Sequence, residues 1–363
     1  MNPISTSHED ALARKLLKDE LDRHSIHIHQ PDDAPLFTKN PSSTMAPVHW
    51  KWADLLRLLK KIGDELTIDS GGHRRTLRLA NPGLPYGTTP TFWCSIQYIL
   101  PGEIAGAHRH TANAMRFIIQ GKGAKSAVDG ELYPFNEGDF VLTPTWCMHD
   151  HVHEGAEPMV WLDILDISLV RSLHACFFEA AEKKQQDISD QPLRTYQEYG
   201  SGLMHPVYPS ETPRANPLLA YPAQMARDAL ERAATLKGNS FDDIALEYVN
   251  PKNGGPVTTT MSTRLIRLRP GFDGTTRRNT GSKVYHILKI LSDLSPRLTP
   301  GVAIFGYAFV SGRALKGVQV TGRETRETLG NRDPLFSVRV QQPATSPTLS
   351  MRGALWWLLL VKH

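Results

Sequence analysis

Five histidines gather in two short segments, at positions 108, 110, 149, 151 and 153. Residues i and i+2 of a strand project from the same face, so His108 and His110 converge on one side. Two imidazoles at this spacing can chelate one cation, and His149 from a neighbouring strand would complete one face of an octahedron. Such a face leaves positions open for a substrate and dioxygen, as in non-heme Fe(II) oxygenases. The sequence therefore predicts a metal site made of His108, His110 and His149.

Further polar residues have the strand parity that would place them beside this site. Arg116 shares the inward face of its strand with Ile118, where a guanidinium can hold a substrate carboxylate by planar, charge-assisted hydrogen bonds. His151 shares the face of His149 and can donate a hydrogen bond or carry a proton, with a packing role as the alternative. Trp93 and Gln97 have the same parity and are predicted to line the pocket, although a tryptophan of this kind can also belong to the core.

The elements that must position these residues are mainly strands. Short β-branched and aromatic runs separated by turn signals fill residues 91–167, which predicts a sandwich or small barrel. Apolar residues recur at helical spacing in residues 11–24, 52–66, 169–184 and 224–236. Sequence patterns typical of strands return at 257–270 and 283–291. We therefore expect a second β-domain to begin near residue 240 and the chain to contain a duplicated module.

Composition excludes several classes of protein. A chain of 363 residues with 40% hydrophobic and 21% charged residues is not dominated by disorder. Three cysteines cannot form a disulfide framework and suit a reducing compartment. No secretory segment, no apolar run long enough to cross a bilayer and no basic run interleaved with aromatics is seen. We expect a cytoplasmic protein with neither a membrane nor a nucleic acid as its partner.

The histidine segments also resemble a known family. The spacing Gly102-x5-His108-x-His110-x10-Gly121, followed by Gly138-x5-Pro144-x4-His149, resembles the paired motifs of a cupin. Many cupins have a Glu four residues after the second histidine, but Ala114 stands there, so a three-histidine site is implied. The flanking sequence resembles that of the gentisate 1,2-dioxygenase family at residues 93–103, 116–121 and 138–144. Salicylate and 1-hydroxy-2-naphthoate 1,2-dioxygenases belong to the same family.

This resemblance implies a mainly β, bicupin fold: two jelly-roll-like barrels (double-stranded β-helices) with N-terminal and linking helices. It implies an Fe(II) enzyme that opens gentisate (2,5-dihydroxybenzoate) between the carboxyl- and hydroxyl-bearing carbons, with both atoms of O2 entering the product, maleylpyruvate. The implied partners are a small aromatic acid and O2, and the implied assembly is a homo-oligomer, a tetramer. A salicylate or 1-hydroxy-2-naphthoate dioxygenase and a bicupin without activity remain as alternatives.

The resemblance also extends to individual residues. Arg74, Arg75 and Arg78 resemble the family's substrate-facing arginines, with a surface cluster as the alternative. Asp163 matches the family's acid on the strand after the third ligand, where it can orient a histidine or an arginine. The residues predicted to act in catalysis are His151, Arg116 and Asp163, and those predicted to bind substrate are Arg74, Arg78, Trp93, Gln97 and Arg116.

The C-terminal part departs from the family's pattern. The second unit has Arg278-Asn279-Thr280 where a His-x-His pair would stand, which predicts a barrel without metal. Residues 291–363 hold nine Lys/Arg against four Asp/Glu, whereas the rest of the chain holds 32 against 33. We interpret these residues as an atypical tail, of the kind that a changed reading frame or a retained intron produces, and expect an incomplete second barrel. The predicted divisions are an N-terminal arm (1–85), the metal-binding cupin (86–170), a helical and irregular linker (171–239), the start of a second cupin (240–290) and the tail (291–363).

Overall fold

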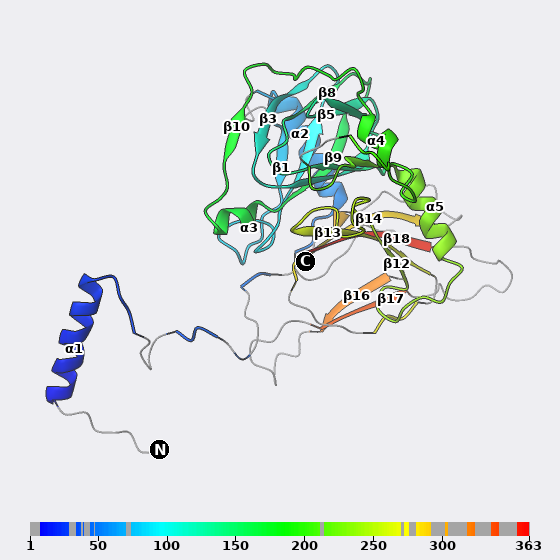
Figure 1. Ribbon diagram of the computed structural model, residues 1–363. Helices are drawn as coiled ribbons and strands as arrows, with labels where there is room; N and C mark the ends of the chain where they lie inside the picture. The colour runs from blue at the N-terminus through cyan, green and yellow to red at the C-terminus, as the bar shows by residue number, and fades with distance from the viewer. Residues whose placement is uncertain are drawn as a thin grey trace. The chain divides into compact units, whose positions relative to one another are not determined.

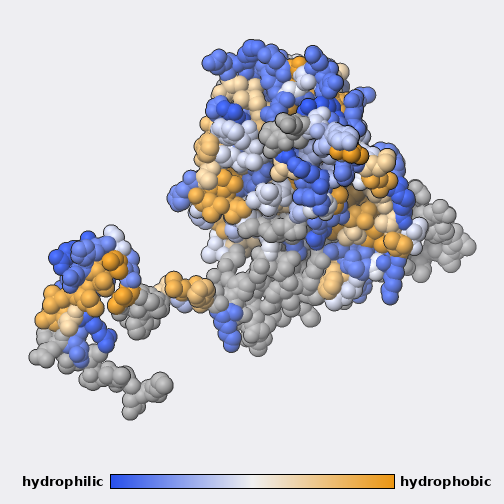
Figure 2. Space-filling model, in the orientation of Figure 1, coloured by the Kyte–Doolittle hydropathy of each residue, from blue (hydrophilic) through white to orange (hydrophobic). Residues whose placement is uncertain are grey.

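The computed structural model describes residues 8–28, 34–37, 39, 44–46, 48–69, 74–210, 214–269, 272–275, 281–291, 302–303, 318–323, 335–340 and 354–362. The chain divides into two units, Met1–Ser42 and Ser43–His363. The first unit contains helix α1 (His8–Arg23), in which Leu12, Leu16 and Leu17 are each roughly half exposed. Figure 2 shows their apolar side of the helix beside a hydrophilic one. None of the helices in the described ranges is both long enough and apolar enough to cross a membrane.

The second unit contains a barrel made of two antiparallel sheets (Figure 1). One sheet has the strand order β1 (Thr76–Arg78), β2 (Trp93–Ile99), β9 (Met159–Leu165), β4 (Ala114–Gln120), β7 (Phe140–Thr143) and β11 (Ala220–Tyr221). The other has the order β10 (Phe178–Ala180), β3 (Ile104–His110), β8 (His149–His153), β5 (Ala124–Val128) and β6 (Glu131–Pro134). The predicted jelly-roll-like barrel is confirmed.

Strand alternation decides which side chains fill the barrel. On β4, Ile118 belongs to the interior cluster that also contains Trp161 of β9. Phe117 and Ile119 point the other way, into a second cluster on the outer face of the sheet. Helix α2 (Trp52–Glu65) covers that outer face, because its buried residues, Trp52, Leu55 and Leu59, recur at helical spacing. The parity predicted for Arg116 therefore agrees with the packing of its strand.

The linker is less helical than its sequence suggests. The predicted helix at 169–184 is wrong beyond its first turn, since α3 covers only Ile167–Ser172. His174 adopts a left-handed φ of 57°, and the chain then runs extended along β3. Backbone hydrogen bonds to β3, such as the one from Ala181 N–H to Ala107 O (2.9 Å), satisfy the polar backbone groups of this segment. Pairing with the sheet therefore overrides the segment's local helix propensity. Two more helices, α4 (Arg194–Tyr199) and α5 (Ala223–Ala233), complete the linker.

A further five-stranded sheet begins the second barrel. Its strand order is β12 (Ile244–Glu247), β13 (Met261–Leu268), β18 (Ala354–Lys362), β14 (Lys283–Leu291) and β15 (Val302–Ala303), and β16 (Val318–Arg323) forms a separate hairpin with β17 (Leu335–Val340). Met261 and Val284 join the cluster on the outer face of the first barrel. The bicupin fold is confirmed, with a second barrel that is incomplete in the described part of the chain. Residues 278–280 and most of the tail lie outside the described residues. The interpretation of the tail as the product of a changed reading frame or a retained intron therefore stays a prediction.

Candidate metal centre

The three predicted ligand histidines come together inside the first barrel. His108 and His110 lie on β3, and His149 begins β8 directly opposite His108. Their ring centroids are 4.2 Å apart for His108 and His149, 4.8 Å for His110 and His149, and 5.5 Å for His108 and His110. One ligand atom from each ring lies within 4.8 Å of the others, so the three can converge on a single metal ion.

A strained turn delivers the third histidine to the other two. Trp146 has a left-handed φ of 62°, which is unusual for a bulky residue. Its backbone N–H donates to the carbonyl oxygen of His110 at 2.8 Å. The turn before β8 is therefore tied directly to the second ligand, and backbone strain of this kind is concentrated at functional sites.

Each ligand ring has one nitrogen held by the backbone. The Nδ1 atoms of His108, His110 and His149 lie 3.0, 2.8 and 3.0 Å from the carbonyl oxygens of Gly106, Ala112 and Cys147. For His110 and His149, the tautomer that donates Nδ1–H to these carbonyls leaves the Nε2 lone pair available, whereas the donor Arg74 Nη2 lies 2.8 Å from Nδ1 and 3.5 Å from Nε2 of His108. The buried Nε2 of His149 has no hydrogen-bond partner within the described residues. A buried acceptor without a partner, facing two more imidazoles, fits a metal ligand set.

Burial keeps these imidazoles neutral. It lowers the pKa of His108 to about 2, with help from the nearby Arg74 cation, and the pKa of His110 to about 4. Burial also lowers the pKa of His149 well below its usual value. A metal ion would then meet neutral ligands at pH 7 without having to displace protons from them. Arg74 itself donates from Nη2 to Gly106 O at 3.1 Å, and the same nitrogen lies 2.8 Å from His108 Nδ1.

Arg116 and Asp163 form a buried ion pair on the facing sheet. Arg116 Nε lies 3.0 Å from Asp163 Oδ1, and Arg116 Nη1 donates to Thr143 Oγ1. Trp161 Nε1 donates to the other carboxylate oxygen at 3.2 Å. Burial raises the pKa of the Asp163 carboxyl, and the neighbouring guanidinium opposes that shift. Asp163 thus orients Arg116. The contacts described above use Nε and Nη1 of the guanidinium and do not involve Nη2.

His151 and Gln97 present unused polar atoms in the same interior. Both ring nitrogens of the buried His151, and Nε2 of the buried Gln97, lack hydrogen-bond partners in the part of the chain that is described. The His151 ring centroid lies 6.0 Å from that of His149, and Trp161 packs edge-on against it at 5.4 Å. Burial, followed by the Arg116 charge, lowers the pKa of His151 well below its usual value. Neutral polar groups without partners are what a bound polar ligand would satisfy.

The three arginines near β1 have different surroundings. Arg74 reaches His108, as described above, whereas Arg75 is buried against Glu103, with both contacts at 2.7 Å, and therefore serves the packing of the barrel. Arg78 is exposed and places its guanidinium carbon 5.2 Å from the centroid of the Trp93 ring. One aromatic neighbour was missed by sequence reasoning: Phe178 stacks on the His108 ring at 5.0 Å. No local pattern links these two residues, because β10 joins β3 from 70 residues away.

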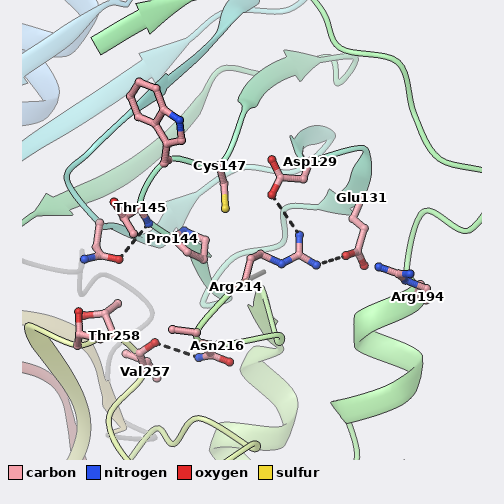
Figure 3. A pocket seen from close by; sticks show the side chains of 14 residues that line it. Asp129, Glu131, Pro144, Thr145, Cys147, Arg194, Arg214, Asn216, Val257 and Thr258 are labelled. Atoms are coloured by element: carbon pink, nitrogen blue, oxygen red, sulfur yellow. Dashed lines mark hydrogen bonds and ion pairs between the residues drawn. The ribbon is translucent and has the colours of Figure 1, made fainter. Parts of the chain in front are cut away.

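A cavity of about 590 Å³ lies beside the turn that precedes β8, and none of the three histidines lines it. Trp146 and Cys147 form part of its wall. Figure 3 shows Arg214 pointing to two carboxylates, Glu131 and Asp129, and its Nη1 lies 3.7 Å from Asp129 Oδ2. Glu131 also accepts hydrogen bonds from the backbone and hydroxyl of Thr195 at 2.8 Å. These ion pairs fasten the linker to the barrel, so the metal centre remains the better candidate for chemistry.

Removing the Arg214 side chain tests this structural role. We expect Arg214→Ala to lower the free energy of unfolding by about 3 kcal/mol, because it leaves the buried Glu131 carboxylate without its cation. Urea unfolding followed by circular dichroism measures the change. Arg194→Ala is the matched control, since this side chain lines the same cavity without a hydrogen bond or ion pair in the described ranges, and we expect less than about 0.5 kcal/mol. Equal losses in the two variants would contradict the assignment.

Comparisons with known proteins agree with the fold and identify the family. A family model described as a cupin domain matches residues 95–165. The 5-aminosalicylate 1,2-dioxygenase of Comamonas sp is 38% identical over 261 residues, which cover 69% of this chain and 68% of that protein. The gentisate 1,2-dioxygenase of Streptomyces sp is 34% identical over 70% of this chain and 73% of its own length. A crystal structure of salicylate 1,2-dioxygenase from Pseudoaminobacter salicylatoxidans with gentisate matches with a TM-score of 0.75 and 26% identity, covering 99% of this chain and 92% of that one. The chain belongs to the gentisate 1,2-dioxygenase family of ring-cleaving bicupin enzymes.

Proposed function

We propose that this chain is an Fe(II)-dependent gentisate 1,2-dioxygenase. It would open gentisate between the carboxyl- and hydroxyl-bearing ring carbons, and both atoms of O2 would enter maleylpyruvate. The observation that carries the proposal is the convergence of His108, His110 and His149, with ligand atoms within 4.8 Å of one another and no carboxylate among them. Three neutral ligands leave a ferrous ion its full charge, which favours an anionic, chelating substrate.

The three histidines would hold the metal. A ferrous ion supplies vacant coordination positions for the substrate's oxygens and the electrons that dioxygen requires to react. Arg116, fixed by Asp163 and Thr143, would use its remaining N–H groups to hold the substrate carboxylate. A neutral His151 can accept a hydrogen bond from the phenolic hydroxyl at one ring nitrogen, and its two partnerless nitrogens support this role.

Other side chains would orient the aromatic ring. Gln97 Nε2 is a buried donor without a partner within the described part of the chain, and it can bond a ring hydroxyl. Arg74, beside His108, adds positive charge next to the site. Trp93 lies on the same strand face as Gln97 and supplies an aromatic wall.

A second candidate substrate is salicylate or 5-aminosalicylate. The 5-aminosalicylate 1,2-dioxygenase of Comamonas sp is 38% identical to this chain, and the matched crystal structure is that of a salicylate 1,2-dioxygenase with gentisate bound. All of these acids carry a carboxylate beside a hydroxyl. They therefore present the same chelating edge and differ only at the far side of the ring.

Oxygen uptake tests the proposal. The full chain is loaded with Fe(II) without air and then mixed with oxygenated gentisate, salicylate, 5-aminosalicylate or 1-hydroxy-2-naphthoate. We expect the fastest uptake with gentisate, accompanied by an ultraviolet change from ring opening. A folded, iron-loaded chain that consumes no oxygen with any of them would favour a bicupin without activity. Faster turnover of salicylate than of gentisate would favour the second candidate.

A further inference from the structure

Four side chains from four separate segments form a continuous stack at one end of the first barrel. Arg78 on β1 lies over the Trp93 ring at 5.2 Å, and Tyr86 packs on Trp93 with ring centroids 4.6 Å apart. Arg171 of α3 then lies over the Tyr86 ring, with its guanidinium carbon 4.0 Å from the ring centroid. Each of these contacts lies within the range of a cation–π or aromatic interaction. We call these four residues the arginine–aromatic stack.

The backbone holds Tyr86 firmly in the middle of this stack. Thr88 Oγ1 donates to Leu79 O at 2.6 Å and accepts from Cys94 N–H at 2.8 Å, which pins the loop to β2. Gly87 has a φ of 85°, and a Cβ atom there would lie 2.3 Å from Ser168 Oγ. Ser168 belongs to α3, the helix that also carries Arg171. The glycine therefore lets loop and helix pack closely, so that Tyr86 is fixed between Trp93 and Arg171.

The stack lies at the exposed end of a row of alternate β2 side chains that face the interior of the barrel. On β2 the row passes from the partly exposed Trp93 through Ser95 to Gln97, which is only 2% exposed. Ser95 pairs in register with Arg78 on one side and with Asp163 on the other. A molecule that reaches Gln97 and the metal centre along this face meets the stack first.

The two arginines give this end a positive charge. Arg78 and Arg171 are exposed, and neither forms an ion pair with a carboxylate in the described ranges. Arg74, also cationic, follows further inside, next to His108. Uncompensated charges of one sign beside a site attract ligands of the opposite sign and raise their association rate.

We propose that Tyr86 and Arg171 belong to the substrate-entrance machinery of this enzyme and select planar aromatic carboxylates. Arg171 attracts the carboxylate of the substrate. Tyr86 is a positioning residue: it holds the Trp93 ring in an orientation on which the ring of an entering aromatic acid can stack. The inference rests on the proposed function and adds to it two residues that act before the metal centre is reached. Neither residue contacts the three histidines in the structure.

The role of Arg171 is tested by substrate association without oxygen. Gentisate is mixed with the anaerobic, Fe(II)-loaded full chain, and tryptophan fluorescence is followed by stopped flow. At about 10 mM ionic strength, where charges act over about 30 Å, we expect Arg171→Gln to slow association by about fivefold. The deficit should shrink towards zero at about 1 M, where screening acts within about 3 Å. Arg57→Gln, an exposed arginine on α2 with the same change of charge, should slow association clearly less than Arg171→Gln does.

The role of Tyr86 is tested by comparing two variants. Tyr86→Phe keeps the ring and should retain the wild-type KM for gentisate, whereas Tyr86→Leu should raise KM by about tenfold with kcat changed less than about twofold. A shift of the tryptophan fluorescence in Tyr86→Leu, absent when Trp93 is also changed to Phe, would report the lost stacking. Equal KM values for the Phe and Leu variants, or identical association rates for Arg171→Gln and Arg57→Gln, would overturn the inference while leaving the proposed function intact. Gentisate binding with these variant effects but no oxygen uptake would overturn the proposed function alone.

Discussion

His149→Ala should abolish iron binding and reduce oxygen uptake by at least about 10³-fold. Changing a group that merely supports a metal ligand lowers affinity by about 10–100-fold, and removing one of three ligands should exceed that loss. The Nε2 atom of His149 is buried without another partner in the described residues, so no hydrogen bond elsewhere competes for it. Anaerobic titration with Fe(II), followed by measurement of bound iron and of oxygen uptake, gives both quantities.

Two comparisons separate this effect from general damage. His205→Ala removes an exposed histidine in the linker and should keep both iron and activity at the wild-type level. Circular dichroism and thermal unfolding establish that His149→Ala is folded. A folded His149→Ala variant that still binds one ferrous ion tightly would contradict the ligand assignment.

Arg116→Lys should lower kcat/KM for gentisate by about 10²-fold, equivalent to about 2.7 kcal/mol, while iron binding is kept. Lysine retains the charge but cannot pair with Asp163 and Thr143 and still present N–H groups to a substrate carboxylate. Steady-state oxygen uptake over a range of gentisate concentrations measures the change.

A matched control uses a partly exposed ion pair in the sheet of the second barrel. Arg264 on β13 contacts Glu247 on β12 through Nε at 2.5 Å, so Arg264→Lys makes the same chemical change there. We expect its kcat/KM to stay within about twofold of the wild type. Similar losses in both variants, or loss of iron in Arg116→Lys, would show that Arg116 does not act on the substrate.

The metal centre could be predicted because its geometry is encoded in local spacing. Alternation along a strand is enough to place His108 and His110 on one face, and the antiparallel pairing of β3 with β8 brings His149 opposite His108. The inward position of Arg116 follows from the same alternation, since Ile118 lies in the interior cluster and Phe117 in the outer one. The carboxylate partner on β9 was expected only from the family resemblance, and the structure pairs it with Arg116 at 3.0 Å.

What could not be predicted depends on contacts between distant segments. Phe178 reaches His108 because β10 adds to the edge of β3, and that same pairing replaces most of the helix expected at 169–184. Arg75 and Arg78 look alike in sequence, but one is buried against Glu103 and the other lies on Trp93. The neighbours of Tyr86 come from β2 and α3, and nothing in the spacing of residues 79–92 indicates them.

Crystallography of the Fe(II)-loaded full chain, with anomalous diffraction at the iron edge, tests the central claim most directly. We expect one anomalous peak per chain, within about 2.3 Å of a ring nitrogen from each of His108, His110 and His149. Iron bound at any other place, or held by only one of these histidines, would contradict the proposed metal centre and the chemistry built on it.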